Sequence, residues 1–156
     1  MAKTRRNKSN GTTRKNIHND KSSASILLKK FQREIVMVFL EVLLMIKLYH
    51  WKTYSYATHK ATDELYGKLN EHMDRFVEIL LGKTEKRIDF MNVKSIKLID
   101  LNSSEQLKIK VDNFKGYLVN LNNNKAMKLM GNMDLLTVRD EILGDLNQFL
   151  YLLTFK

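Results

Sequence analysis

Residues 50–82 read HWKTYSYATHKATDELYGKLNEHMDRFVEILLG, and this stretch decides the fold. From Thr62 onward, apolar residues recur at intervals of three or four, which is the repeat of a helix with one buried stripe. The stripe consists of Leu65, Leu69, Met73, Phe76 and Leu80. The sequence therefore predicts an amphipathic helix that continues to Gly82.

One flank of this helix carries four candidate metal ligands. At 100° per residue they fall within one sector, as two pairs whose members are four residues apart: His59 with Asp63, and Asp74 with Glu78. Imidazole nitrogen and carboxylate oxygen suit divalent iron, manganese or zinc. Acid pairs at this spacing are also common on solvated helix faces, so the metal-site hypothesis depends on all four residues sharing one flank.

The two pairs cannot meet on one chain, because His59 and Asp74 are separated by about 22 Å of helix. A second copy of the helix, packed antiparallel about a two-fold axis, would bring the first pair of one copy to the second pair of the other. The axis would pass near Gly67 and Asn70, which lie on the same face. A glycine inside a helix costs about 1 kcal/mol relative to alanine, and close approach of two backbones would explain it. The spacing thus predicts a homodimer with metal sites between its subunits.

These residues resemble the Dps branch of the ferritin-like proteins over about 33 residues. The resemblance lies in a His-Trp pair, a histidine with a carboxylate four residues on, Glu-Leu-Tyr, Glu-His-x-Asp and a final Glu. It implies an intersubunit ferroxidase site with the ligands His50, His59, Asp63, Asp74 and Glu78, and places Trp51 beside that site. Iron (Fe2+) would be weakly held and act as a substrate, and the family implies a shell of twelve subunits. The interval from His50 to His59 is about three residues shorter than in the family.

Composition supports one all-α domain. The chain has 156 residues with no proline, six glycines and no cysteine, which favours long helices and excludes disulfides and thiolate ligands. The formal net charge is +10, and residues 1–22 carry seven basic side chains against Asp20 alone. We therefore divide the chain into a basic tail, residues 1–22, and a helical bundle, residues 23–156.

The tail has almost nothing to bury, so disorder is expected. Its basic side chains would bind DNA or RNA phosphates without sequence preference, and binding would weaken steeply with salt. These side chains are Lys3, Arg5, Arg6, Lys8, Arg14, Lys15 and Lys21. Some Dps-like proteins carry a similar tail that binds DNA. The alternative is a tail that only improves solubility.

The remainder predicts a ferritin-like four-helix bundle with a long crossover between helices 2 and 3. A first helix, from about Ala24 to Trp51, is apolar on more than one face and so requires more than one covering surface. Glu41 and Lys47 interrupt it, which argues against a membrane span. Residues 53–58 form a short connection. About 20 residues after Gly82 lack clear periodicity and would cross over the bundle, with a short extended piece at 94–101.

The second half of the chain predicts two more helices. Ser103 or Ser104 would cap the third, and residues 133–154 would form the last. Glu-x-x-His, the motif of di-iron centres inside a bundle, does not occur in the sequence, so an intrasubunit centre is not expected. Asp140, Glu141 and Asp145 are interpreted as surface or pore-lining residues.

The other histidines are not expected to bind metal. His18 lies in the tail, and His72 is placed on the solvated side of the second helix. The sequence also lacks a glycine-rich phosphate loop and a His-Glu-x-x-His motif.

Two functions remain open. One is a Dps-like, iron-binding homo-oligomer that oxidises Fe(II) and binds nucleic acid through its tail. The other is a catalytically inert helical scaffold that packages DNA or RNA, and a weaker resemblance to ferritin-like proteins of large DNA viruses favours it. No membrane association is expected, and the cytoplasm, the nucleoid or a virion would be the location.

Overall fold

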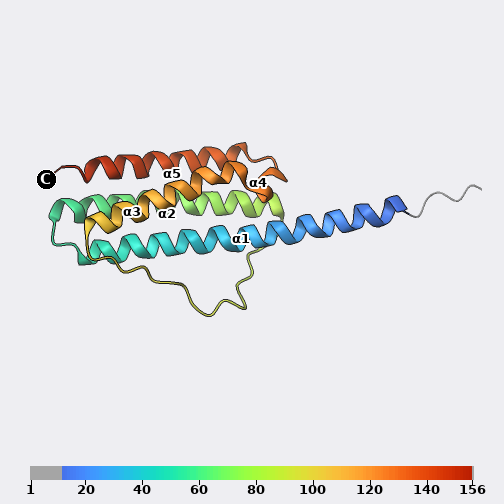
Figure 1. Cartoon of the computed structure of the whole chain (residues 1–156), viewed down its shortest axis with the longest axis horizontal. Coiled ribbons are helices and arrows are strands. Elements are labelled where there is room, and N and C mark those ends of the chain that lie inside the picture. The colour runs from blue at the N-terminus through green and yellow to red at the C-terminus, as the bar shows by residue number, and fades with distance from the viewer. Residues whose placement is uncertain (1–11, 156) are drawn as a thin grey trace, which may run out of the picture.

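The computed structural model describes residues 12–155, with side chains from residue 22 onward. All regular structure in this part of the chain is helical: α1 (Thr12–Lys52), α2 (Tyr56–Thr84), α3 (Ser104–Asn120), a 3₁₀ turn (Leu121–Asn123), α4 (Lys125–Lys128) and α5 (Met133–Leu152). The four long helices pack side by side as a bundle (Figure 1). The all-α prediction is thereby confirmed.

A single long connection determines the topology. Helix α2 runs antiparallel to α1 after a three-residue link, whereas α2 and α3 run in the same direction (Figure 1). Residues 85–103 therefore return along the bundle beside α1. Arg33 holds Asp89 near one end of this crossover, and Lys52 donates to Asp100 and Asn102 near the other. Residues 94–101 form no strand.

Capping serines define two of the helix starts. The Ser55 hydroxyl accepts a hydrogen bond from the backbone N–H of Thr58 at the start of α2. The Ser103 hydroxyl accepts one from the backbone N–H of Gln106 at the start of α3. Ser103 was one of the two caps expected for α3. Helix α2 begins earlier than expected, at Tyr56, so only residues 53–55 connect it to α1.

Helix α1 corrects the expected boundary of the tail. It begins at Thr12 rather than near Ala24, so residues 12–22 continue the helix instead of forming a disordered tail. Once a helix is nucleated, each added residue gains a hydrogen bond, and no glycine or proline occurs between Thr12 and Lys52. The prediction for residues 1–11 lies outside the described part of the chain.

The core lies where the four long helices meet. Phe39 of α1 packs edge-on against Phe76 of α2, with ring centroids 5.4 Å apart, and against Phe114 of α3 at 6.3 Å. The predicted stripe on α2 is buried throughout. Helix α1, in contrast, leaves apolar side chains partly uncovered on its outer face, including Leu40 and Leu44, which are each 37% exposed.

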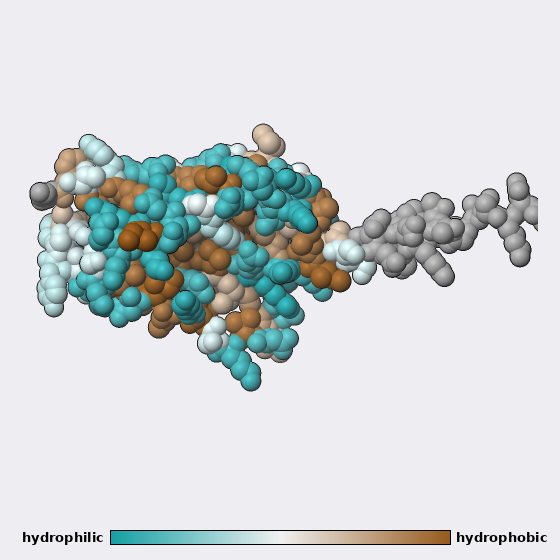
Figure 2. All heavy atoms as spheres, viewed as in Figure 1, coloured by the Kyte–Doolittle hydropathy of each residue, from teal (hydrophilic) through white to brown (hydrophobic). Residues whose placement is uncertain are grey.

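Figure 2 shows hydrophobic residues among hydrophilic ones on the visible surface of the bundle. Among the described residues, no helix is long and apolar enough to cross a membrane.

Candidate metal centre

Two histidines meet where α1 ends and α2 begins. The rings of His50 and His59 stack with their centroids 3.9 Å apart and their planes inclined by 23°. The Nδ1 atom of His50 lies 3.0 Å from the backbone oxygen of His59, and Nδ1 of His59 lies 3.0 Å from the backbone oxygen of His50. A carbonyl oxygen only accepts hydrogen bonds, so each Nδ1 must carry the proton. In a neutral ring with this tautomer, Nε2 carries no proton and can bind a metal ion.

Thr62 supports this pair, and sequence reasoning missed it. Its buried hydroxyl donates toward the carbonyl oxygens of Thr58 and His59, at 2.8 and 3.0 Å, and its oxygen lies 3.3 Å from Nδ1 of His50. The sequence feature that could have identified Thr62 is a threonine on the buried stripe of α2, three residues after the candidate ligand His59. A ligating histidine is commonly oriented in this way through its second nitrogen.

Asp63 is the third polar group at this place. Its Oδ1 lies 3.8 Å from Nε2 of His50 and 3.8 Å from Nζ of Lys47. The Lys47 ammonium also lies over the rings of Tyr66 and Trp51, at 4.7 and 5.9 Å from their centroids. Sequence reasoning used Lys47 only against a membrane span and gave it no place at the site.

Trp51 lies close to Lys47, whose ammonium is over its ring, but it does not pack inside the chain. Its side chain is 68% exposed. Within one chain Trp51 is therefore a surface residue.

Asp74 and Glu78 lie elsewhere on α2. Both are exposed, and about 22 Å of helix separates Asp74 from His59. Gly67 and Asn70 are exposed between the two pairs. Among the described residues, no group of three or more histidine, cysteine, aspartate or glutamate side chains is arranged to hold a metal ion. One chain thus stacks His50 on His59 and places Asp63 3.8 Å from His50, while Asp74 and Glu78 lie elsewhere on α2.

His72 faces α5 rather than solvent, which corrects its placement on the solvated side. Its side chain is 20% exposed, with Nε2 3.1 Å from an Asp145 oxygen and Nδ1 3.5 Å from a Glu141 oxygen. Arg75 pairs with the same Glu141. The carboxylates of α5 therefore face His72 and Arg75 of α2, and His72 is not directed toward the His50–His59 pair.

Lys68 continues this polar contact between α2 and α5. Its ammonium lies 2.9 Å from Glu64 and 3.7 Å from Asp145, and it donates to Gln148 at 2.8 Å. The hydrogen bond to Glu64 raises the pKa of Lys68 above its ordinary value. Asp145 is thus an interhelical contact and not a freely exposed side chain, whereas Asp140 is exposed and accepts from Arg139.

The predicted nucleic-acid contacts fall outside the described side chains. Lys3, Arg5, Arg6 and Lys8 precede the described residues. Arg14, Lys15 and Lys21 lie within the backbone of α1.

Residues 50–153 match the family of unknown function DUF5856. The chain belongs to this family. The region matched to DUF5856 contains all five predicted ligands and the helices α2 to α5, and it begins at the first of the two stacked histidines. No curated protein and no solved structure matches the chain.

Proposed function

We propose that two copies of this chain form an iron site between them, and that the protein is a Dps-like ferroxidase. The observation that carries the proposal is the stacked pair His50 and His59. Each ring donates a hydrogen bond from Nδ1 to the other residue's carbonyl oxygen, which leaves two Nε2 atoms for a metal ion.

The donor set fits Fe(II). Two imidazole nitrogens and the carboxylate of Asp63 would form a mixed nitrogen and oxygen donor set without thiolate, which suits iron better than a soft metal ion. Lys47, 3.8 Å from Asp63, places a positive charge next to this carboxylate. A metal ion that binds Asp63 must therefore compete with the ammonium, which favours weak, transient binding of iron as a substrate.

The second half of the site would come from the partner copy. Asp74 and Glu78 are exposed on α2 and form no ion pair among the described residues. Leu40 and Leu44 on the outer face of α1 are partly uncovered, which supports a covering subunit. An antiparallel arrangement about Gly67 and Asn70 makes two equivalent sites by symmetry.

In this arrangement the histidines and carboxylates bind and position Fe(II), and peroxide or oxygen accepts its electrons. Assembly of such dimers into a shell of twelve subunits would follow the Dps pattern. The ferric product would then collect inside the shell.

The first test removes the acidic half of the site. In the variant Asp74→Ala with Glu78→Ala, we expect the initial rate of Fe(II) oxidation, followed by absorbance, to fall at least about tenfold. The matched control is Glu64→Ala with Glu71→Ala, which removes two carboxylates from a different flank of α2. Equal rates for the site variant and the wild type would place the chemistry elsewhere.

A second test distinguishes a shared site from one within a subunit. The variant His59→Ala with Asp63→Ala, and the variant Asp74→Ala with Glu78→Ala, should each be inactive alone. If they are unfolded and refolded together, about half of the dimers are mixed and each mixed dimer keeps one intact site, so activity should return to about a quarter of the wild-type level. No recovery in mixed dimers would contradict the intersubunit arrangement.

A second function is supported by the charge distribution: non-specific binding of nucleic acid through the N-terminal segment. Residues 1–22 carry seven basic side chains and one acidic one, and α1 projects beyond the bundle at this end (Figure 1). Deletion of residues 1–11 removes four basic side chains. It should lower the slope of log affinity against log salt for a DNA duplex by up to about 3.6. An unchanged slope would refute a role for this segment.

The inert scaffold remains a distinct outcome. It would bind DNA with the same salt dependence but would not oxidise Fe(II) faster than buffer alone. The two assays together therefore separate the ferroxidase from a packaging protein.

A further inference from the structure

A group of cationic side chains gathers where the projecting part of α1 leaves the bundle. Lys29 of α1 and Lys86 and Arg87 of the crossover line one surface cavity of about 280 Å³, together with the paired residues Arg33 and Asp89. We call Lys29, Lys86 and Arg87 the basic collar. Four cations against one carboxylate give this cavity a formal charge of +3.

The charges of the basic collar are not neutralised within the described chain. None of its three residues forms an ion pair there, and Lys86 donates a hydrogen bond of 3.0 Å to the Ser25 hydroxyl. The nearby Lys83 and Arg33, in contrast, bind Asp134 and Asp89. Unpaired cations at a concave surface are unfavourable for an isolated protein, because like charges repel one another there.

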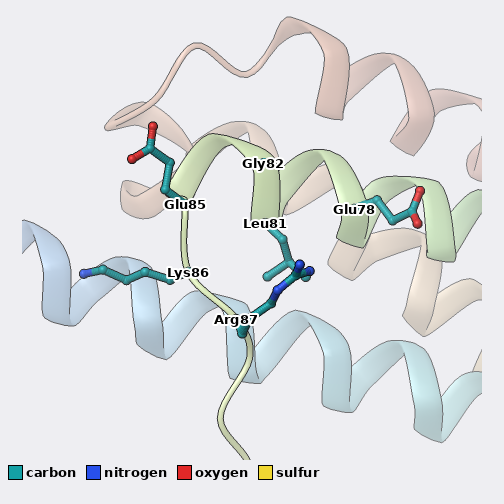
Figure 3. A pocket seen from close by; sticks show the side chains of 6 residues that line it. All are labelled: Glu78, Leu81, Gly82, Glu85, Lys86 and Arg87. Carbon is teal, nitrogen blue, oxygen red and sulfur yellow. The ribbon is translucent and has the colours of Figure 1, made fainter.

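Two further carboxylates near the basic collar, Glu78 and Glu85, are directed away from it (Figure 3). Glu78 and Glu85 line the adjoining cavity of about 420 Å³ with Lys86 and Arg87. Figure 3 shows Lys86 extended along α1 and Arg87 directed toward Leu81, while the carboxylates of Glu78 and Glu85 point to other sides. The cationic groups are therefore accessible to an anion from solvent.

The position of the basic collar suggests which anion it binds. The bond from Lys86 to Ser25 places it at the base of the helix that continues to Thr12. About 20 Å of α1 extends from Ser25 to Thr12, and residues 1–22 carry a net charge of +6. A backbone with phosphates at regular intervals can contact both residues 12–22 of α1 and the basic collar.

We propose that the basic collar is a second phosphate-binding surface for double-stranded DNA. This inference rests on the proposed nucleic-acid binding and extends it from the N-terminal segment to the folded body. The guanidinium of Arg87 can bind two phosphate oxygens at once, whereas Lys29 and Lys86 act as point charges. Such contacts carry no base specificity.

The test uses the full chain with Lys29→Gln, Lys86→Gln and Arg87→Gln combined. Affinity for a 30-bp duplex of arbitrary sequence is measured by fluorescence anisotropy at several salt concentrations. Loss of three phosphate contacts should lower the slope of log affinity against log salt by about 2.7, and affinity near 0.1 M salt by at least about tenfold.

The matched control is Lys97→Gln, Lys108→Gln and Lys110→Gln, which removes the same charge around the start of α3, toward the other end of the bundle (Figure 1). Circular dichroism and sedimentation establish that both variants keep the fold and assembly. A salt slope that falls equally in the two variants, or in neither, would overturn the proposal.

The outcomes also separate this inference from the function on which it rests. If the wild type does not bind the duplex, both are wrong. If deletion of residues 1–11 lowers the slope but the collar variant does not, only the basic collar is refuted. If the collar variant alone lowers it, the basic collar stands and the N-terminal segment is not the binding element.

Discussion

At the scale of single residues, the candidate site depends on which nitrogen of each histidine is free. The sequence predicted His59 and Asp63 as neighbours because they are four residues apart on one helix. It could not predict that His50 stacks on His59, because that contact depends on a connection of only three residues and on the mutual hydrogen bonds to backbone carbonyls. The shorter interval between the histidines is therefore compatible with their contact in this chain.

Tyr117 provides a test of polar burial. Its hydroxyl is buried without a hydrogen-bond partner in the described structure, and burial, with a smaller effect of Glu34, raises its pKa. An unpaired buried hydroxyl costs about 1 kcal/mol or more. Tyr117→Phe should therefore increase the free energy of unfolding by about 1 kcal/mol in urea denaturation, whereas Tyr151→Phe, at an exposed position, should not change it. A destabilised Tyr117→Phe would indicate that the hydroxyl has a partner.

Asp134 should contribute to acid sensitivity. Its carboxylate accepts one hydrogen bond from Lys83 at 2.8 Å and another from the backbone N–H of Leu135 at 2.9 Å. These bonds lower the pKa of Asp134 below its ordinary value, and the bond from Lys83 has the larger effect. The folded state therefore holds fewer protons than the unfolded state. Its stabilisation is complete above the unfolded pKa and is lost as pH falls through the folded value.

The variant Asp134→Asn removes this contribution. Its free energy of unfolding should fall less steeply than that of the wild type between about pH 5 and pH 2. The pKa of Asp89 is also lowered, mainly by the hydrogen bond from the N–H of Met91 and to a smaller extent by Arg33. The stability of the variant should therefore still depend on pH in this range. Parallel curves for the variant and the wild type in guanidinium denaturation would show that Asp134 is not linked to folding.

At the scale of elements, the regular periodicity of the chain predicted the helices well and their ends less well. The stripe of α2 is buried as expected, and α3 and α5 also bury stripes that repeat at three or four residues. The start of α1 was missed because residues 12–22 have no apolar stripe. Residues 12–22 are helical because they extend the part of α1 that packs in the bundle, and burial of their own side chains does not specify the helix.

Arg139 joins two of these elements and was not anticipated. It lies on the apolar stripe of α5 with its side chain 7% exposed, and it donates to the carbonyl of Leu118 at 3.3 Å and to the Asn122 side chain at 3.1 Å. It thus bonds the C-terminal end of α3, where carbonyl groups lack helical partners. An arginine on an otherwise apolar stripe is the signal that sequence reading can use.

We expect Arg139→Met to lower the free energy of unfolding by about 1–3 kcal/mol, because the buried carbonyl oxygen of Leu118 loses its donor. Arg139→Lys should recover only part of this loss, since one ammonium cannot reproduce the fork of a guanidinium. Chemical denaturation measures both, with the exposed Lys128→Met as control. Full recovery by lysine would mean that charge alone matters.

At the scale of the whole molecule, the fold of one chain leaves its proposed site incomplete. The sequence predicted this result from helix geometry alone, since no straight helix brings His59 to Asp74. It predicted the single crossover as well, because a connection of about 20 residues between two helices permits them to run parallel. What one sequence cannot predict is how two copies pack, because their contact depends on side chains of α1 and α2 that single-chain folding leaves exposed.

The proposed two-fold axis can be tested at Gly67. A Cβ atom added there meets nothing within 4 Å in the chain, and the same holds for Gly116 on α3. Within one subunit, alanine at either position should therefore stabilise its helix by up to about 1 kcal/mol. Any loss of assembly caused by Gly67→Ala must then arise from contact with another copy.

We expect Gly67→Ala to shift sedimentation toward smaller species and to reduce Fe(II) oxidation together with assembly, because the added methyl groups face each other across the axis. Gly116→Ala should keep the wild-type assembly while showing the same gain in helix stability. A more stable Gly67→Ala protein with unchanged assembly and full activity would move the axis away from this residue. The intersubunit site would then require a different register of the two α2 helices.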